Sequence, residues 1–179
     1  MNTPLQLASF SESTDTVRHY LPESSDLERT PFALSDLTSA SQLLIWSIRK
    51  WLQIRRFPGK FDNQIMDAHR TVRLPEAAES LEDCMAILAS SALRPVIIEC
   101  PCQPYLSCDE LTLLKTFRAL SSKTLGPAEQ HLARLVKGRI ANVFCRSAKD
   151  YVLSLSAAGF DLNRITKLKL VEEKCHVSN

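Results

Sequence analysis

Hydrophobic residues recur along most of this chain every three or four positions, which is the spacing of one face of an α-helix. Prolines and glycines interrupt the pattern and divide it into separate elements. The pattern predicts helices over about 37–56, 60–73, 75–92, 107–120, 127–137 and 139–158. Helices joined by short connections favour an all-α fold, a single-domain bundle of about six helices.

The clearest element boundary in the chain is at Ser107. A serine can cap a helix N-terminus with its hydroxyl, and Glu110, three residues later, completes a capping box. Leu106 and Leu111 have the spacing of a hydrophobic staple, and Asp109 places negative charge in the first turn. The sequence therefore predicts that a helix begins at Ser107 and that the other helices pack around the turn before it. Ser35 or Asp36 is the expected cap of the first helix.

The two ends of the chain lack the helical pattern. Residues 1–33 are rich in Ser, Thr, Pro and charged residues and predict a disordered, flexible N-terminal arm. This leaves 34–162 as the helical domain and 163–179 as a C-terminal tail. Residues 95–98 are apolar and mostly β-branched, and we expect them to form an extended connector. At most one short β-pairing is expected, and 165–171 is its candidate partner.

The net charge of +2 is unevenly distributed along the sequence. It is −3 over 1–35, +4 over 36–74, −6 over 75–110 and +7 over 111–179. Blocks of opposite sign often pack against each other or steer a charged partner, and the simpler interpretation is that they are adjacent solvated faces of one domain. The four glycines form neither a G-x-G-x-x-G nor a Walker-type loop, which argues against a Gly-rich nucleotide site.

The chemically unusual segment is ECPCQPYLSC, residues 99–108, which holds three of the six cysteines. Pro101 and Pro104 stiffen the loop. Cys108 falls in the first turn of the predicted helix, where the helix dipole lowers the pKa of a thiol, while Asp109 and Glu110 oppose that shift.

Four interpretations of these cysteines are open. Cys100, Cys102 and Cys108 could bind zinc or iron with Cys145, Cys84, Cys175 or a histidine as the fourth ligand, although C-x-C-x5-C is not a zinc-ribbon spacing. Cys100 or Cys102 could pair reversibly with Cys108. Cys100-Pro101 resembles the short Cys-Pro motif of haem-regulated proteins. The simplest interpretation is that the thiols are small residues packed under the loop.

The segment WSIRKWLQIRRFPGK, residues 46–60, combines two tryptophans with basic side chains at the end of a predicted helix. A partner protein is the preferred occupant of this surface, and nucleic acid or an anionic membrane surface is the alternative. The simpler interpretation is a buried Trp face with a solvated basic end. Trp51, with Phe117, is the expected anchor of the core. The candidate binding residues are Trp46, Arg49, Lys50, Arg55, Arg56 and Lys60.

No long apolar run and no signal sequence is evident, so we expect a cytoplasmic location. An enzyme is disfavoured, because the one nucleophile–base pair to consider, Cys108 with His131, depends entirely on the fold. The expected function is that of a non-enzymatic regulatory or adaptor protein acting through macromolecular binding. The alternative is a thiol- or metal-based sensor at the cysteine loop. Sulfurs clustered within ligand distance would support the sensor, and sulfurs scattered through the core would support the adaptor.

Overall fold

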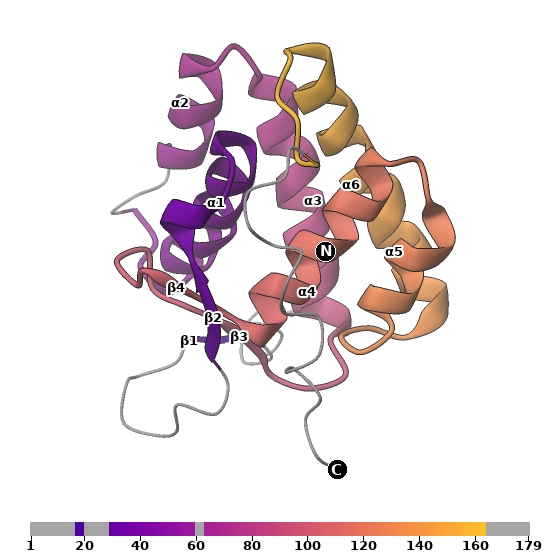
Figure 1. The fold of residues 1–179 in the computed structure, drawn as a ribbon. Coiled ribbons are helices and arrows are strands. Elements are labelled where there is room, and N and C mark those ends of the chain that lie inside the picture. Colours follow the sequence, from indigo (N-terminus) through magenta and orange to yellow (C-terminus); the bar gives the residue numbers. More distant parts are fainter. Residues whose placement is uncertain (1–16, 20–28, 60–62, 164–179) are drawn as a thin grey trace, which may run out of the picture.

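The computed structural model describes residues 17–19, 29–59 and 63–163, and over these residues the protein is a bundle of α-helices (Figure 1). A short 3-10 helix, Leu34–Asp36, precedes the first of them. The all-α prediction is confirmed. The six helices within the described ranges are α1 (Ser39–Arg56), α2 (Gln64–Thr71), α3 (Pro75–Ser91), α4 (Cys108–Ser121), α5 (Leu125–Leu132) and α6 (Gly138–Ala157).

Helix α4 begins as the sequence predicts. The Oγ of Ser107 accepts the backbone N–H of Glu110 at 3.0 Å, and the carboxylate of Glu110 accepts the N–H of Ser107 at 2.9 Å. The Ser107 hydroxyl also donates to the carbonyl of Ile97 at 2.6 Å, which ties the cap to the preceding strand. The cap therefore satisfies backbone groups on two elements at once.

Other helix boundaries differ from the prediction by a few residues. Thr38 is the N-cap of α1, since its side chain accepts the N–H of Ser41 at 3.2 Å, whereas Ser35 and Asp36 lie in the 3-10 helix. Helix α5 begins before Pro127 and ends at Leu132 rather than near 137. Of the residues predicted to open α2, 60–62 lie outside the described ranges.

Two short strand pairs join distant parts of the chain. Strand β1 (Val17–His19) pairs parallel with β3 (Val96–Ile98), and β2 (Arg29–Ala33) pairs antiparallel with β4 (Tyr105–Ser107). Two strands thus lie inside the segment 1–33 predicted as an arm, and there are two pairings where at most one was expected. Residues 95–98 were predicted as a connector, but 96–98 form a strand. The proposed partner of that segment, 165–171, lies outside the described residues.

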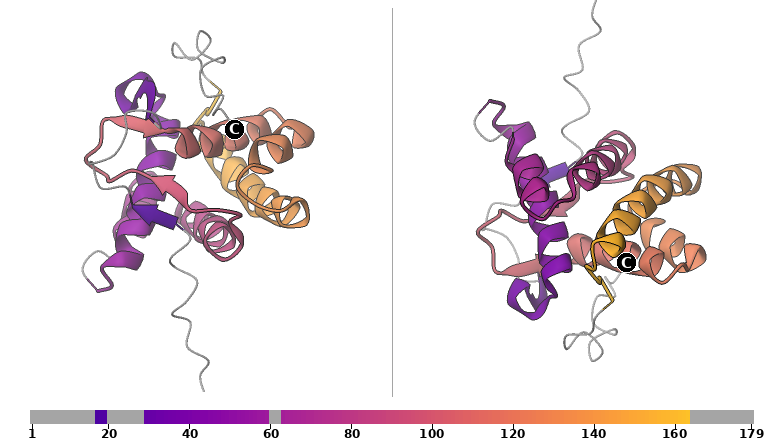
Figure 2. Two further views of the ribbon diagram at one scale, coloured as in Figure 1. Left: turned by 90° about the horizontal axis from the view of Figure 1, so that it is seen from below. Right: turned by 90° about the horizontal axis from the view of Figure 1, so that it is seen from above.

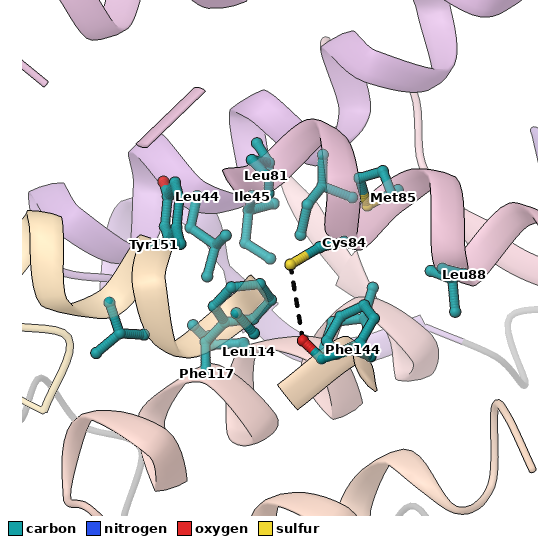
Figure 3. Packing of buried hydrophobic residues seen from close by; sticks show 14 of the residues in the cluster. Leu44, Ile45, Leu81, Cys84, Met85, Leu88, Leu114, Phe117, Phe144 and Tyr151 are labelled. Atoms are coloured by element: carbon teal, nitrogen blue, oxygen red, sulfur yellow. Dashed lines mark hydrogen bonds between the residues drawn. The ribbon is translucent and has the colours of Figure 1, made fainter. Parts of the chain in front are cut away.

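The core lies where α3, α4 and α6 meet, with α1 and α2 on one side and α5 on the other (Figure 2). Phe117 of α4 lies edge-on to Phe144 and Tyr151 of α6, with ring centroids 5.9 Å and 5.5 Å apart (Figure 3). Trp51 is 4% exposed and Phe117 is 1% exposed, which confirms both predicted core anchors. Each buried large apolar side chain of this kind contributes about 1.5–3 kcal/mol to stability.

The chain after α6 folds back onto the helices. Gly159 has a φ of +79°, and the N–H of Phe160 donates to the carbonyl of Leu155 at 2.9 Å, so the predicted glycine does end this helix. Farther on, the Leu162 side chain is buried, and its carbonyl accepts the Nε of Arg118 at 2.8 Å. This docking fixes the end of α6 against α4.

Candidate binding groove and cysteine turn

Arg49 of α1 is fully buried and forms a clamp between three elements. Its Nε and Nη2 donate to the two carboxylate oxygens of Glu110 at 2.7 Å and 2.8 Å. Its remaining N–H groups donate to the carbonyls of Cys100, Gln103 and Tyr105 at 3.3, 2.5 and 2.8 Å. A guanidinium has five N–H donors, and these five bonds use all of them. Arg49 therefore has no donor left for a partner.

The buried position of Arg49 contradicts its prediction as a binding residue. Arg49 was placed on the basic surface of the first helix, but it points into the protein. Ile45 and Leu52 are buried at the positions four before and three after it, so Arg49 lies within the apolar stripe of α1. That position in the stripe was the sequence signal for its burial.

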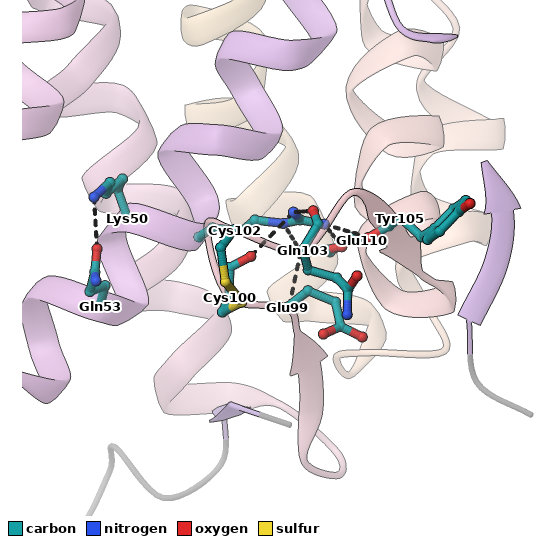
Figure 4. The surroundings of a disulfide bond; sticks show 9 residues. Lys50, Gln53, Glu99, Cys100, Cys102, Gln103, Tyr105 and Glu110 are labelled. Atoms are coloured by element: carbon teal, nitrogen blue, oxygen red, sulfur yellow. Dashed lines mark hydrogen bonds and ion pairs between the residues drawn. A yellow bond between two sulfur atoms is a disulfide. The ribbon is translucent and has the colours of Figure 1, made fainter. Parts of the chain in front are cut away.

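The clamp holds the cysteine loop in a defined turn (Figure 4). Cys100 and Cys102 form a disulfide, with Cα atoms 5.4 Å apart, and the N–H of Gln103 donates to the carbonyl of Cys100 at 3.0 Å. Glu110 also accepts the N–H of Glu99 at 3.0 Å. We call Cys100 to Gln103 the cysteine turn. The bonded pair is Cys100 with Cys102, whereas the redox hypothesis paired one of them with Cys108.

The remaining described sulfurs do not gather around this turn. Cys108 is the first residue of α4 and is half-buried, while Cys84 and Cys145 are buried in the core. Burial, together with the nearby carboxylate of Glu129, raises the pKa of Cys145 to about 11. Burial is also the main cause that raises the pKa of Cys84 well above its ordinary value. Both core thiols are therefore protonated at neutral pH and are poor nucleophiles and ligands.

The predicted metal set is not assembled in the described part of the chain. No group of three or more His, Cys, Asp and Glu side chains is placed there to hold an ion. Cys100 and Cys102 bond to each other, and Cys145 is a residue of α6 that is buried in the protein core, away from the turn. Cys175 lies outside the described ranges. Because the sulfur of Cys100 is bonded to that of Cys102, this oxidised form offers no Cys100 thiolate to haem.

The other predicted basic residues lie around the end of α1. Lys50 lies over the ring of half-buried Trp46, 5.8 Å from its centroid, and donates to Gln53 at 2.8 Å. Arg56 is exposed and lies over the ring of Phe57 at 5.8 Å. Arg55 is exposed as well, and Lys60 lies outside the described ranges. The structure thus keeps a basic end on α1, without Arg49.

A groove of about 640 Å³ opens beside this end of α1, between α1, α2 and α3. This volume is in the range of small-molecule ligand pockets. Trp51 and Leu81 form its buried floor, and Glu79 and Asp83 stand exposed on its α3 wall. The groove is lined by Trp51, Ile54, Arg55, Pro58, Ile65, Met66, Ala78, Glu79, Leu81, Glu82 and Asp83.

A polar pair joins the α1 and α3 walls of the groove. The indole Nε1 of Trp51 donates to Glu82 at 2.5 Å, and Arg55 forms an ion pair with the other oxygen of the same carboxylate. The guanidinium of Arg55 also lies over the Trp51 ring, 5.1 Å from its centroid. Glu82 thereby neutralises Arg55, while Glu79 and Asp83 form no ion pair with any described residue.

One wall of this groove was predictable from the sequence, and the other walls were not. The basic end of α1 was visible as a charge cluster, but the acidic wall comes from a helix that begins about twenty residues later. The only signal for it was the change from a +4 block over 36–74 to a −6 block over 75–110. Arg49 with Glu110 and Arg55 with Glu82 are ion pairs between those two blocks.

Comparison with known proteins assigns neither a family nor a function to this chain. No protein-family model, no curated protein and no solved structure matches this chain. Among the described residues, no helix has the length and apolar character needed to cross a membrane.

Proposed function

We propose that this protein is a non-enzymatic regulatory or adaptor protein of the cytoplasm, and that it binds a protein partner through the groove at the end of α1. The observation that supports the proposal is an open groove with an apolar floor and charged walls. Apolar area that a partner can cover provides affinity, and charges at the rim provide specificity.

The charges of the groove favour a protein over nucleic acid or an anionic membrane. Phosphate groups would meet the carboxylates of Glu79 and Asp83, which are four residues apart and so lie on one face of α3. Arg55, the basic residue that lines the groove, is already paired with Glu82. Two neighbouring carboxylates repel each other, and a cation between them relieves that repulsion.

This charge pattern defines the chemistry of the partner. We infer a protein segment that places an apolar side chain on the Trp51 and Leu81 floor and a Lys or Arg beside Glu79 and Asp83. Phe57, 49% exposed next to the groove, adds an apolar surface for such a segment. Cys84 and Cys145 lie in the core and Cys108 lies at the start of α4, and this spread of the described cysteines outside the turn fits an adaptor better than a metal sensor.

The test is a selection of random peptides on the full-length protein. Enriched peptides are expected to combine apolar and basic residues and to lose at least about tenfold in affinity for Asp83→Lys, about 1.4 kcal/mol. Asp150→Lys makes the same charge change at an exposed position of α6 outside the groove, and it should bind like the wild type. Equal losses in both variants, or no enrichment at all, would overturn the proposal.

The alternative partners are measured in parallel. A mixed-sequence RNA and vesicles containing phosphatidylserine are titrated with the wild type at low and physiological salt. If the proposal is correct, neither the RNA nor the vesicles will show binding that depends on the groove. Binding of either probe that increases in Asp83→Lys and falls with salt would instead assign the surface to a polyanion.

A further inference from the structure

The cysteine turn has a geometry that suits reversible chemistry. Cys100 and Cys102 occupy the first and third positions of a β-turn closed by the bond from Gln103 N–H to the Cys100 carbonyl. Pro101 takes the second position, where its fixed φ is favourable. The bond between N–H and carbonyl involves no sulfur. The turn therefore keeps the two side chains together whether the sulfurs are bonded or reduced.

We propose that Cys100 and Cys102 form a thiol–disulfide exchange site, which takes external thiols and dithiols as substrates. Residue exposure favours attack at Cys102, because Cys102 is exposed and Cys100 is half-buried, and we assign the attack of the incoming thiolate to the sulfur of Cys102. Cys84 and Cys145 are buried and protonated and take no part.

A structural role explains this disulfide poorly. A bond between residues two apart closes a very short loop, and it removes little conformational entropy from the unfolded chain. The loop is already fixed by the three carbonyl contacts of Arg49. Opening the disulfide would therefore leave the surrounding fold in place, which is the property that an exchange site needs.

The reaction balances with a dithiol as the reductant. Its thiolate attacks the sulfur of Cys102, a mixed disulfide forms, and the bond between Cys102 and Cys100 breaks. Cys100 leaves as a thiolate and takes a proton from water. The second thiol of the dithiol then attacks the mixed disulfide and releases Cys102, so the dithiol is oxidised to a disulfide and the pair is reduced by two electrons. Oxidised glutathione or a protein disulfide reverses the sequence.

The test is a redox titration of the full-length protein. The chain is equilibrated in graded ratios of reduced and oxidised glutathione, the thiols are alkylated, and each cysteine is read by mass spectrometry. We expect one two-electron transition shared by Cys100 and Cys102, unchanged in Cys108→Ser. A pair that never forms a disulfide, that stays oxidised at the highest thiol ratio, or that loses its transition in Cys108→Ser would overturn the proposal.

Trapping the intermediate identifies the attacked sulfur. In Cys100→Ser the resolving thiol is gone, so Cys102 should accumulate at least about tenfold more mixed disulfide with glutathione than the wild type. The reverse variant, Cys102→Ser, should trap less, and equal or greater trapping there would refute the assignment to Cys102. Circular dichroism verifies the fold of both variants, and the wild-type titration tests the site without them.

Two further measurements complete the test of the exchange site. Glutathione and a dithiol protein of the C-x-x-C type are compared as reductants, and the faster one identifies the source of electrons. The groove variant Asp83→Lys should keep the same transition, because the exchange site does not depend on the proposed partner. Failure of this proposal and failure of the binding proposal are therefore separate results.

Discussion

At the scale of single residues, two buried polar side chains differ in how completely their hydrogen-bonding atoms are paired. The five N–H groups of Arg49 all reach acceptors, which belong to four residues of the segment 100–110. His69 is equally buried, yet only its Nδ1 is paired, with the carbonyl of Ile65 at 2.9 Å. Its Nε2 has no partner among the described residues. The two side chains should therefore respond differently to substitution and to pH.

Replacing Arg49 by methionine should lower the free energy of unfolding by about 3–5 kcal/mol, because it leaves a buried carboxylate without its counter-charge. The control is Arg55→Met, in an ion pair whose side chains are 49% and 46% exposed, where we expect a loss of about 1 kcal/mol. Urea denaturation followed by circular dichroism measures both. Similar losses for the two variants would contradict the role given to the Arg49 clamp.

His69 should make stability depend on pH. Burial is the main cause that lowers the pKa of His69 in the folded protein, and the bond to Ile65 opposes it. The neutral form is therefore favoured by folding, and its full contribution is present above pH 6.5. Below that pH the unfolded chain takes up a proton first, so stability should fall by up to about 1.4 kcal/mol per pH unit until the folded pKa is reached.

The measurement compares unfolding free energies between pH 8 and pH 5 for three proteins. His69→Leu should lose the dependence of the unfolding free energy on pH, while His131→Gln, on α5, should keep it. A wild-type curve parallel to that of His69→Leu would show that His69 does not titrate differently in the two states.

At the scale of elements, local patterns predicted the helices well and the strands poorly. The capping box at Ser107 involves residues three apart, and α4 begins where it indicates. Strand β2 contains Pro31 and no alternation of apolar residues, and its partner Leu106 lies 76 residues from Thr30, whose hydroxyl donates to the Leu106 carbonyl at 3.0 Å. No local signal reports a pairing over that distance. The local rules therefore gave helix positions but not the contacts between distant segments.

Removing the cap should weaken α4 and the strand beside it together. We expect Ser107→Ala to cost about 2 kcal/mol, at the upper end for an N-cap, because the same hydroxyl also bonds the Ile97 carbonyl. Ser39→Ala changes an exposed residue in the first turn of α1 and should stay within about 0.5 kcal/mol of the wild type. Thermal unfolding of both variants tests this. A loss below about 0.5 kcal/mol for Ser107→Ala would show that the box contributes little.

At the scale of the whole molecule, the chain is held together by contacts between its first and second halves. The basic block over 36–74 meets the acidic block over 75–110 through Arg49 and Arg55, and because the Arg49–Glu110 pair is fully buried, the two blocks are more than the adjacent solvated faces of the simpler interpretation. The groove could not be predicted in the same way, because its walls come from three helices whose packing is not encoded in local spacing. The disulfide between Cys100 and Cys102 was likewise not predicted, since the redox hypothesis paired one of them with Cys108.

The N-terminal segment should contribute to stability rather than act as a dispensable arm. Phe32, in β2, is 8% exposed, so Phe32→Ala should lower the free energy of unfolding by about 3 kcal/mol. Phe57 is 49% exposed, and Phe57→Ala should cost less than about 1 kcal/mol. Guanidinium denaturation compares the two. Equal small effects would indicate that β2 is not part of the folded domain.

The separation in sequence between Arg49 and its hydrogen-bond partners affects how the protein folds during synthesis. The carbonyl of Cys100 lies 51 residues after Arg49, and the carboxylate of Glu110 lies 61 residues after it. During synthesis from the N-terminus, α1 is complete long before anything can neutralise the cation in its apolar stripe, and burying that cation alone is costly. We therefore expect the nascent first half to have no stable fold of its own, and the protein to fold only when the segment after Ile98 has emerged.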